Sequence, residues 1–131
     1  MRSLWSNQVG DEGAKALASA LEVNAVLTKL DMSRNWVGPQ LGIVMAEALK
    51  VNSVLTSLNL AENYVGPALG VAMAEALKVN RVMTSLDLRV NNIRSEGGVA
   101  LAEALKVNGV LNTITLDRSP LPVKQLKGTE R

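Results

Sequence analysis

The stretch LNLAENYVGPALGVAMAEALKVN, from Leu58 to Asn80, nearly repeats LDMSRNWVGPQLGIVMAEALKVN, from Leu30 to Asn52. The second halves of the two copies almost coincide, whereas the first halves, up to the aromatic residue, differ. Other residues recur at the same spacing of 28 positions. They are Asn7, Asn35, Asn63 and Asn91; Asn24, Asn52, Asn80 and Asn108; and Leu21, Leu49, Leu77 and Leu105. A fixed period of this length indicates a repeat protein.

Each unit contains two hydrophobic periods. In residues 56–63, Leu58 and Leu60 alternate with polar neighbours, which predicts a short strand with one buried face. From Pro67 to Lys78, apolar residues at spacings of three and four predict one face of a helix. A single unit cannot bury its apolar face alone, so successive units are expected to stack.

The length of 131 residues predicts a single domain, 1–131. It divides into a partial unit, three repeats and a partial C-terminal unit: 1–28; 29–56, 57–84 and 85–112; 113–131. The chain starts within a strand, and its end is too short and too rich in proline to complete a helix. We therefore expect a piece of a longer array. Its uncapped ends would expose Leu4, Val9, Ile114 and Leu116 and permit end-to-end self-association.

The composition excludes several classes of function. The chain contains neither His nor Cys, so imidazole bases, thiol nucleophiles, disulfides and Cys/His zinc sites are ruled out, and we expect no cofactor or metal. A net charge of +2, with the two signs interspersed, gives no reason to expect nucleic acid as a partner. No apolar run is long enough to span a membrane, and no signal peptide is visible, so we expect a cytoplasmic location.

The pattern LxLxxNxV/I, followed by Gly and by a helix containing LAxAL or MAEAL and a closing Asn, resembles the ribonuclease-inhibitor-like subfamily of leucine-rich repeats. Ribonuclease inhibitor, the sensor arrays of NOD-like receptors and Ran GTPase-activating protein share this repeat. The resemblance covers residues 1 to about 118. It implies an α/β fold: a right-handed solenoid arc of four to five units, with a parallel sheet on the concave face and helices on the convex face.

The recurring residues have structural interpretations. Asn7, Asn35, Asn63 and Asn91 stand where each strand turns into a loop, and an amide there can bond the backbone of adjacent units in a structural Asn ladder. The alanines of two series are expected to be small because neighbouring helices pack against one another. The series are Ala18, Ala46, Ala74 and Ala102, and Ala20, Ala48, Ala76 and Ala104.

The variable residues predict a binding surface. Between 29–56 and 57–84, differences concentrate in the strand and the following loop, at residues expected to line the concave face, which is the usual binding face of such arrays. Trp36 and Tyr64 share a register position, and aromatic and Arg residues are enriched at interface hot spots. The candidate partner-binding residues are Trp5, Lys29, Asp31, Arg34, Trp36, Asn59, Glu62, Tyr64, Asp87 and Arg89. The alternative is that the rings only cover the loop beneath them.

The leading hypothesis is a protein-protein interaction module without catalysis of its own. No P-loop, nucleophile elbow or metal cluster is present in the sequence. One alternative is a regulator of a small GTPase, in which Arg34 or Arg89 would contact the transferring phosphate. Another is a structural segment of a longer receptor or sensor array without an independent activity.

Overall fold

The computed structural model describes residues 2–3, 10–35, 40–116 and 120–122. Short strands and longer helices alternate within these ranges, so the fold is α/β, as the two hydrophobic periods predict. The strands are β1 (Arg2–Ser3), β2 (Lys29–Asp31), β3 (Ser57–Asn59), β4 (Ser85–Asp87), β5 (Thr113–Thr115) and β6 (Pro120–Pro122). The helices are α1 (Gly10–Val23), α2 (Gln40–Val51), α3 (Pro67–Val79) and α4 (Arg94–Leu105).

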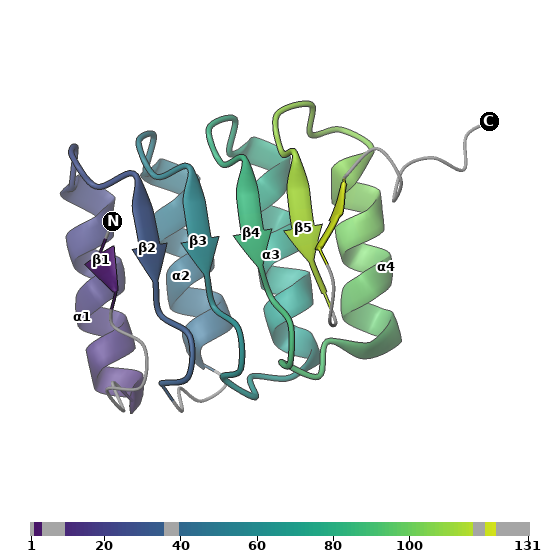
Figure 1. Cartoon of the computed structure of the whole chain (residues 1–131), viewed down its shortest axis with the longest axis horizontal. Helices are drawn as coiled ribbons and strands as arrows, with labels where there is room; N and C mark the ends of the chain where they lie inside the picture. Colours follow the sequence, from purple (N-terminus) through teal and green to yellow (C-terminus); the bar gives the residue numbers. More distant parts are fainter. Residues whose placement is uncertain (1, 4–9, 36–39, 117–119, 123–131) are drawn as a thin grey trace.

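The strands form one sheet in the order of the sequence, β1 to β6. Strands β1 to β5 are parallel, and β2 to β5 pair at an offset of 28 residues, so that Leu30, Leu58, Leu86 and Ile114 form one row across the sheet. The four helices lie side by side on one face of this sheet (Figure 1). Within the described ranges no helix lies on the opposite face, which we call the open face (Figure 1).

The core lies between the sheet and the helices and is built from aliphatic side chains. Leu58 and Leu60 of one unit point into it and are almost fully buried, together with Leu69, Met73 and Leu77 from α3. In the described ranges, no helix has the length and the apolar character that crossing a membrane requires.

The two alanine series mark the two sides of each helix-helix junction. Ala18, Ala46 and Ala74 are buried, but the corresponding Ala102 of the last helix is exposed. In the other series Ala48, Ala76 and Ala104 are fully buried, but Ala20 of the first helix is exposed. The exposed members therefore identify the two outer faces of the helix layer.

A ladder of buried amides connects adjacent units at the ends of the strands. Asn35, Asn63 and Asn91 are at most 1% exposed. The Asn63 side chain accepts a 2.8 Å hydrogen bond from the backbone N–H of Asn35, and its Nδ2 donates to the carbonyl oxygens of Met32 (3.1 Å) and Leu60 (2.9 Å). One amide thus satisfies backbone groups of two neighbouring repeats. Asn7 lies outside the described residues.

A second amide ladder runs along the opposite edge of the core, where each helix ends. Asn52 accepts from the N–H groups of Val54 and Leu55 and donates 2.7 Å to the carbonyl of Leu21 in the preceding repeat. Asn80 and Asn108 repeat these contacts one and two units further on. The sequence shows that these residues recur, but it does not show that they connect one repeat to the next.

The C-terminal end differs from the expectation in one respect. Ile114, which was expected to be exposed at an uncapped end, is fully buried, and Leu116 is partly buried against the core. The physical reason is that β6 turns back and pairs antiparallel with β5, opposite Ile114. This prediction was wrong because a short, proline-containing segment can still serve as an edge strand. Leu4 and Val9, expected to be exposed at the other end, lie outside the described residues.

Replacing Asn63 by Ala should cost roughly 2–4 kcal/mol of unfolding free energy, because it leaves several buried backbone groups without a partner. Urea denaturation measures this loss. Asn59→Ala is the matched control: Asn59 is only half-buried and its side chain bonds the backbone of its own loop, so its loss should be clearly smaller. Equal losses in the two variants would contradict a ladder that connects repeats.

Gly70 and Gly98 occupy the same register position on successive helices. A Cβ at Gly70 would lie 2.7 Å from the Cα of Gly97 and 2.7 Å from Cγ2 of Ile93, whereas a Cβ at Gly98 would meet nothing within 4 Å. Gly70→Ala should therefore destabilise the protein by about 1–3 kcal/mol. Gly98→Ala should stabilise it by up to about 1 kcal/mol, because Ala is the better helix former. Thermal unfolding of the two variants tests the difference, and a stabilising Gly70→Ala would contradict the tight approach of α3 and α4.

Candidate functional site

The open face presents one half-exposed row of polar side chains. The strands are too short to expose more than their first and last residues, because the middle leucine of each points into the core. Asp31, Asn59 and Asp87 stand at the ends of β2, β3 and β4 and are directly paired across the sheet. Lys29 lies at the other end of β2 and is exposed.

The residues of this row also shape the loops that follow them. The side-chain oxygens of Asp31, Asn59 and Asp87 each accept a hydrogen bond from the backbone N–H two residues later, at 2.9, 2.9 and 3.2 Å. Such a bond lets an Asp or Asn side chain hold a turn. All three are candidate partner-binding residues, and their role in holding the turns was not predicted from the sequence. The recurrence of Asp or Asn at intervals of 28 was the available signal.

The loops after β2 and β3 are joined by an ion pair between successive repeats. Arg34 Nε lies 2.8 Å from Glu62 Oε1, and both residues have positive φ, 59° and 60°. The left-handed conformation is unfavourable for residues other than Gly, Asn and Asp. It recurs at Val90 in the next unit, with φ 55°. The loop therefore places a residue in the left-handed conformation at the same position in these three repeats, although the side chains differ.

Arg89 extends this polar surface into a third repeat. Its Nε lies 3.5 Å from Asp87 Oδ2, close enough for an ion pair, but the same Nε is buried and makes no hydrogen bond among the described residues. Its side chain as a whole is 40% exposed. A buried donor without a hydrogen bond is unfavourable, whereas the exposed part of the guanidinium can still donate to another molecule.

These side chains surround an open cavity of about 250 Å³ on the open face. Its lining comes from three successive repeats: Asp31, Ser33, Arg34, Asn59, Glu62 and Arg89. Five of the ten candidate partner-binding residues therefore meet at one place. The cavity is polar, with two guanidinium groups and two carboxylates, and such a surface can form directed hydrogen bonds with a protein.

The remaining candidates do not line the cavity. Lys29 is at the far end of its strand, and Asp87 lies beside the cavity, paired with Arg89. Tyr64 follows the ladder residue Asn63 on the loop, with its side chain 54% exposed and φ 55°. Trp5 and Trp36 lie outside the described residues, so a shared aromatic rim of Trp36 and Tyr64 stays a prediction.

The described residues were also considered as ligands for a metal ion or a phosphate group. Among the described residues, no group of three or more acidic side chains is arranged to hold a metal ion. Arg34 and Arg89, the two residues considered for phosphate contact, are both paired with carboxylates, Glu62 and Asp87. Regulation of a GTPase through these arginines therefore stays a prediction for which the geometry offers no support.

The pKa of Asp87 is raised above its ordinary value of 3.8. Burial is the main cause, because it penalises the charged carboxylate. The hydrogen bond from the Arg89 backbone and the charge of its guanidinium oppose the shift, whereas the negative charges of Asp31 and Glu62 add to it. The ionised carboxylate of Asp87 is thus less favourable in the folded chain than in the unfolded one.

Comparison with known proteins agrees with this architecture. A family profile described as "Leucine Rich repeat" matches residues 3–18, 23–40 and 79–102. No curated protein sequence matches the chain.

Two solved structures share the fold. One, described as "Leiomodin-1 Actin-Binding Site 2 (ABS2)", superposes with a TM-score of 0.82 at 21% identity, over 97% of this chain and 76% of that one. The tropomodulin C-terminal domain of Caenorhabditis elegans superposes with a TM-score of 0.75 at 12% identity, over 98% of this chain and 81% of that one. The matched profile is thus that of a leucine-rich repeat, and the two solved structures have the same fold as this chain.

Asp87→Asn should stabilise the fold more at pH 7 than at pH 3. Below its ordinary pKa, Asp87 is neutral in both the folded and the unfolded chain and resembles Asn. As the pH rises through the raised folded-state pKa, the partly buried carboxylate ionises. The free energy of unfolding then falls in the natural chain but not in the variant, which has no carboxyl group at this position. Asn at the matching position 59 already makes the same turn bond, so the substitution fits the loop. The measurement is the difference in unfolding free energy between the two chains at both pH values.

The reciprocal variant Asn59→Asp serves as the control. It places a third carboxylate between Asp31 and Asp87, so its stability should fall more at pH 7 than at pH 3. If the difference in unfolding free energy between each variant and the natural chain does not change with pH, then burial of a carboxylate on this face does not lower stability.

Proposed function

We propose that this chain binds a protein partner through the open face and the adjoining loops, and that it has no catalytic activity of its own. The observation that carries the proposal is the polar cavity, because side chains of three repeats converge on it. Binding across several repeats is how stacked arrays present an extended surface. The guanidinium of Arg89, whose side chain is 40% exposed, supplies N–H donors that a partner's carbonyl or carboxylate can engage.

We further propose that the chain belongs to the ribonuclease-inhibitor-like subfamily of leucine-rich repeats. In this proposal it forms a right-handed solenoid of four to five units, and the open face is concave. The proposed location is the cytoplasm. The repeat pattern of the sequence and the 28-residue offset between neighbouring strands support the assignment to a stacked repeat array.

Actin is the first partner to test, because the leiomodin-1 segment that shares this fold is described as an actin-binding site. The likeness in fold does not carry the binding residues across at 21% identity, so the test depends on variants of this chain. Arg89→Ala removes a cavity residue whose Nε makes no hydrogen bond among the described residues, and Tyr64→Ala removes an exposed ring.

We expect Arg89→Ala and Tyr64→Ala to weaken partner binding by about tenfold or more while thermal stability changes little. Lys78→Ala is the matched control, because Lys78 forms an exposed ion pair with Glu75 on the helix side, 3.6 Å apart. Cosedimentation with filaments and titration with monomeric actin measure the binding.

A photo-activatable residue tests the binding face for any partner, actin or another. Placed at Asn59, it should crosslink proteins in a cell extract, with competition from unlabelled natural chain and weaker competition from the Arg89→Ala variant. Placed at Glu75, it should not. Stronger crosslinking from Glu75 would move the binding surface to the helices and refute the proposed site.

A further inference from the structure

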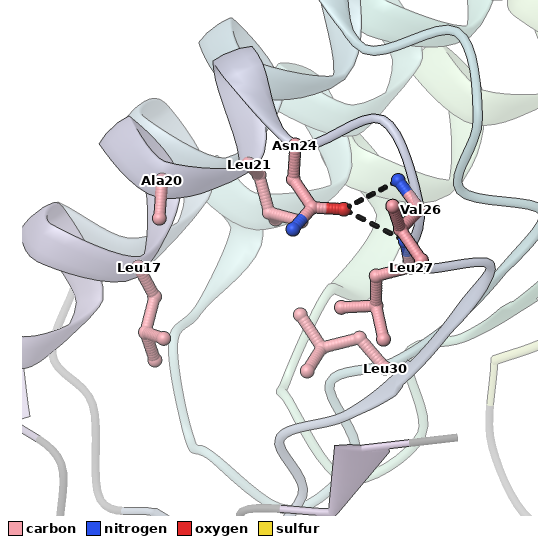
Figure 2. A pocket seen from close by; sticks show the side chains of 7 residues that line it. All are labelled: Leu17, Ala20, Leu21, Asn24, Val26, Leu27 and Leu30. Atoms are coloured by element: carbon pink, nitrogen blue, oxygen red, sulfur yellow. Dashed lines mark hydrogen bonds between the residues drawn. The ribbon is translucent and has the colours of Figure 1, made fainter.

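An apolar groove of about 330 Å³ opens on the N-terminal side of the helix layer. It is lined by Leu17, Ala20, Leu21, Asn24, Val26, Leu27 and Leu30. Figure 2 shows the side chains of α1 on one side and those of the following turn and β2 on the other, pointing toward a shared space. The groove differs in kind from the polar cavity of the open face, because its lining is almost entirely aliphatic.

The interior repeats show what covers such a surface. Ala20 is exposed, but its counterparts Ala48, Ala76 and Ala104, one, two and three repeats on, are fully buried. Leu17 and Leu27 are half-buried. Their counterparts are at most 4% exposed: Met45, Met73 and Leu101 for Leu17, and Leu55, Met83 and Leu111 for Leu27. Each interior helix packs against the helix of the preceding repeat, in the junctions α1 with α2, α2 with α3 and α3 with α4, and such a helix is the neighbour that α1 lacks among the described residues.

Asn24 also differs from its counterparts in the interior repeats, in the hydrogen bonds of its side chain. Its Oδ1 accepts from the N–H groups of Val26 (2.9 Å) and Leu27 (2.7 Å), as in the second amide ladder. In that ladder the other half of the amide, Nδ2, donates to a carbonyl of the preceding repeat, as Asn52 does to Leu21. Asn24 makes no such donation to the described residues. Figure 2 shows its nitrogen on the side away from the two turn bonds.

We propose that this groove is the docking surface for one further leucine-rich repeat of the same 28-residue type, with its helix parallel to α1. The incoming repeat would present a small residue where Ala18 stands in α1, and a carbonyl of its last helical turn would accept from Asn24 Nδ2. A second copy of this chain fits less well: the sheet edge that it could offer at its C-terminal end is occupied by β6, which runs antiparallel.

The test places a copy of residues 29–56 directly before residue 1 of the full chain, which preserves the register of 28. The added unit should raise the thermal midpoint within a single cooperative transition, because each repeat is stabilised by its neighbours. It should also slow hydrogen exchange of the α1 backbone by about tenfold or more. Two transitions, with the original midpoint and the α1 exchange rates unchanged, would refute the proposal.

Ala20→Lys distinguishes docking from a merely tethered unit. In the natural chain Ala20 is exposed and the substitution should be tolerated, whereas in the extended chain the lysine would be buried as Ala48 is, and the midpoint should fall by about 10 °C or more. Ser19→Lys is the matched control, because residue 19 and its counterpart Glu47 are both exposed. Equal effects of Ala20→Lys in both chains would contradict the docking geometry.

Two further measurements complete the test. Asn24→Asp retains the oxygen that holds the turn but removes the Nδ2 donor, so it should lower the midpoint of the extended chain more than that of the natural chain. Sedimentation of the natural chain tests whether a second copy of the chain occupies the groove instead. A dimer that Ala20→Lys dissociates would show that a second copy occupies the groove, and would overturn the proposal.

Discussion

The buried side-chain amides of asparagine are the interaction on which the rest of this structure depends. Each interior repeat turns twice, once from strand to loop and once from helix back to strand, and the asparagines at these turns are buried. An amide can donate and accept at the same time, so Asn63 and Asn52 satisfy the turn of their own repeat and a backbone group of the one before. Because the ladder bonds connect residues of adjacent units, they fix the offset of 28 between the strands.

Because of this constraint, the two sides of the molecule differ in how readily they accept amino-acid substitutions. On the helix side, packing demands small residues, and Gly70 approaches Gly97 so closely that even a methyl group has no room. On the open face, the backbone is held by the amides and by the turn bonds of Asp31, Asn59 and Asp87. The other side chains there can vary without loss of the fold. A polar cavity built from three repeats is therefore compatible with a rigid scaffold beneath it.

The two ends of the array differ because their edges are completed differently. At the C-terminal end β6 pairs with β5, and Ile114 is buried as in the interior. At the N-terminal end, α1 has no preceding helix among the described residues, so Ala20 is exposed and Val26 is 83% exposed. An aliphatic surface of this kind is stabilised by contact with another apolar surface. The groove on α1 is therefore open among the described residues, whereas the equivalent surface of each interior repeat is buried.

The sequence by itself determined the period of 28, the alternation of strand and helix, the aliphatic core and the positions of the amides, because all of these recur in the letters at regular intervals. The contrast between the constant and variable halves of the repeat also predicted a set of binding residues on the strands and the following loops. Only the tertiary structure decided which of them meet: five converge on a cavity, while Lys29 and Tyr64 stand apart from it. It likewise decided that Asp87 is partly desolvated, that the second asparagine series links repeats, and that β6 covers Ile114. These outcomes depend on distances between residues of different repeats or on a chain reversal, which no local pattern of residues encodes.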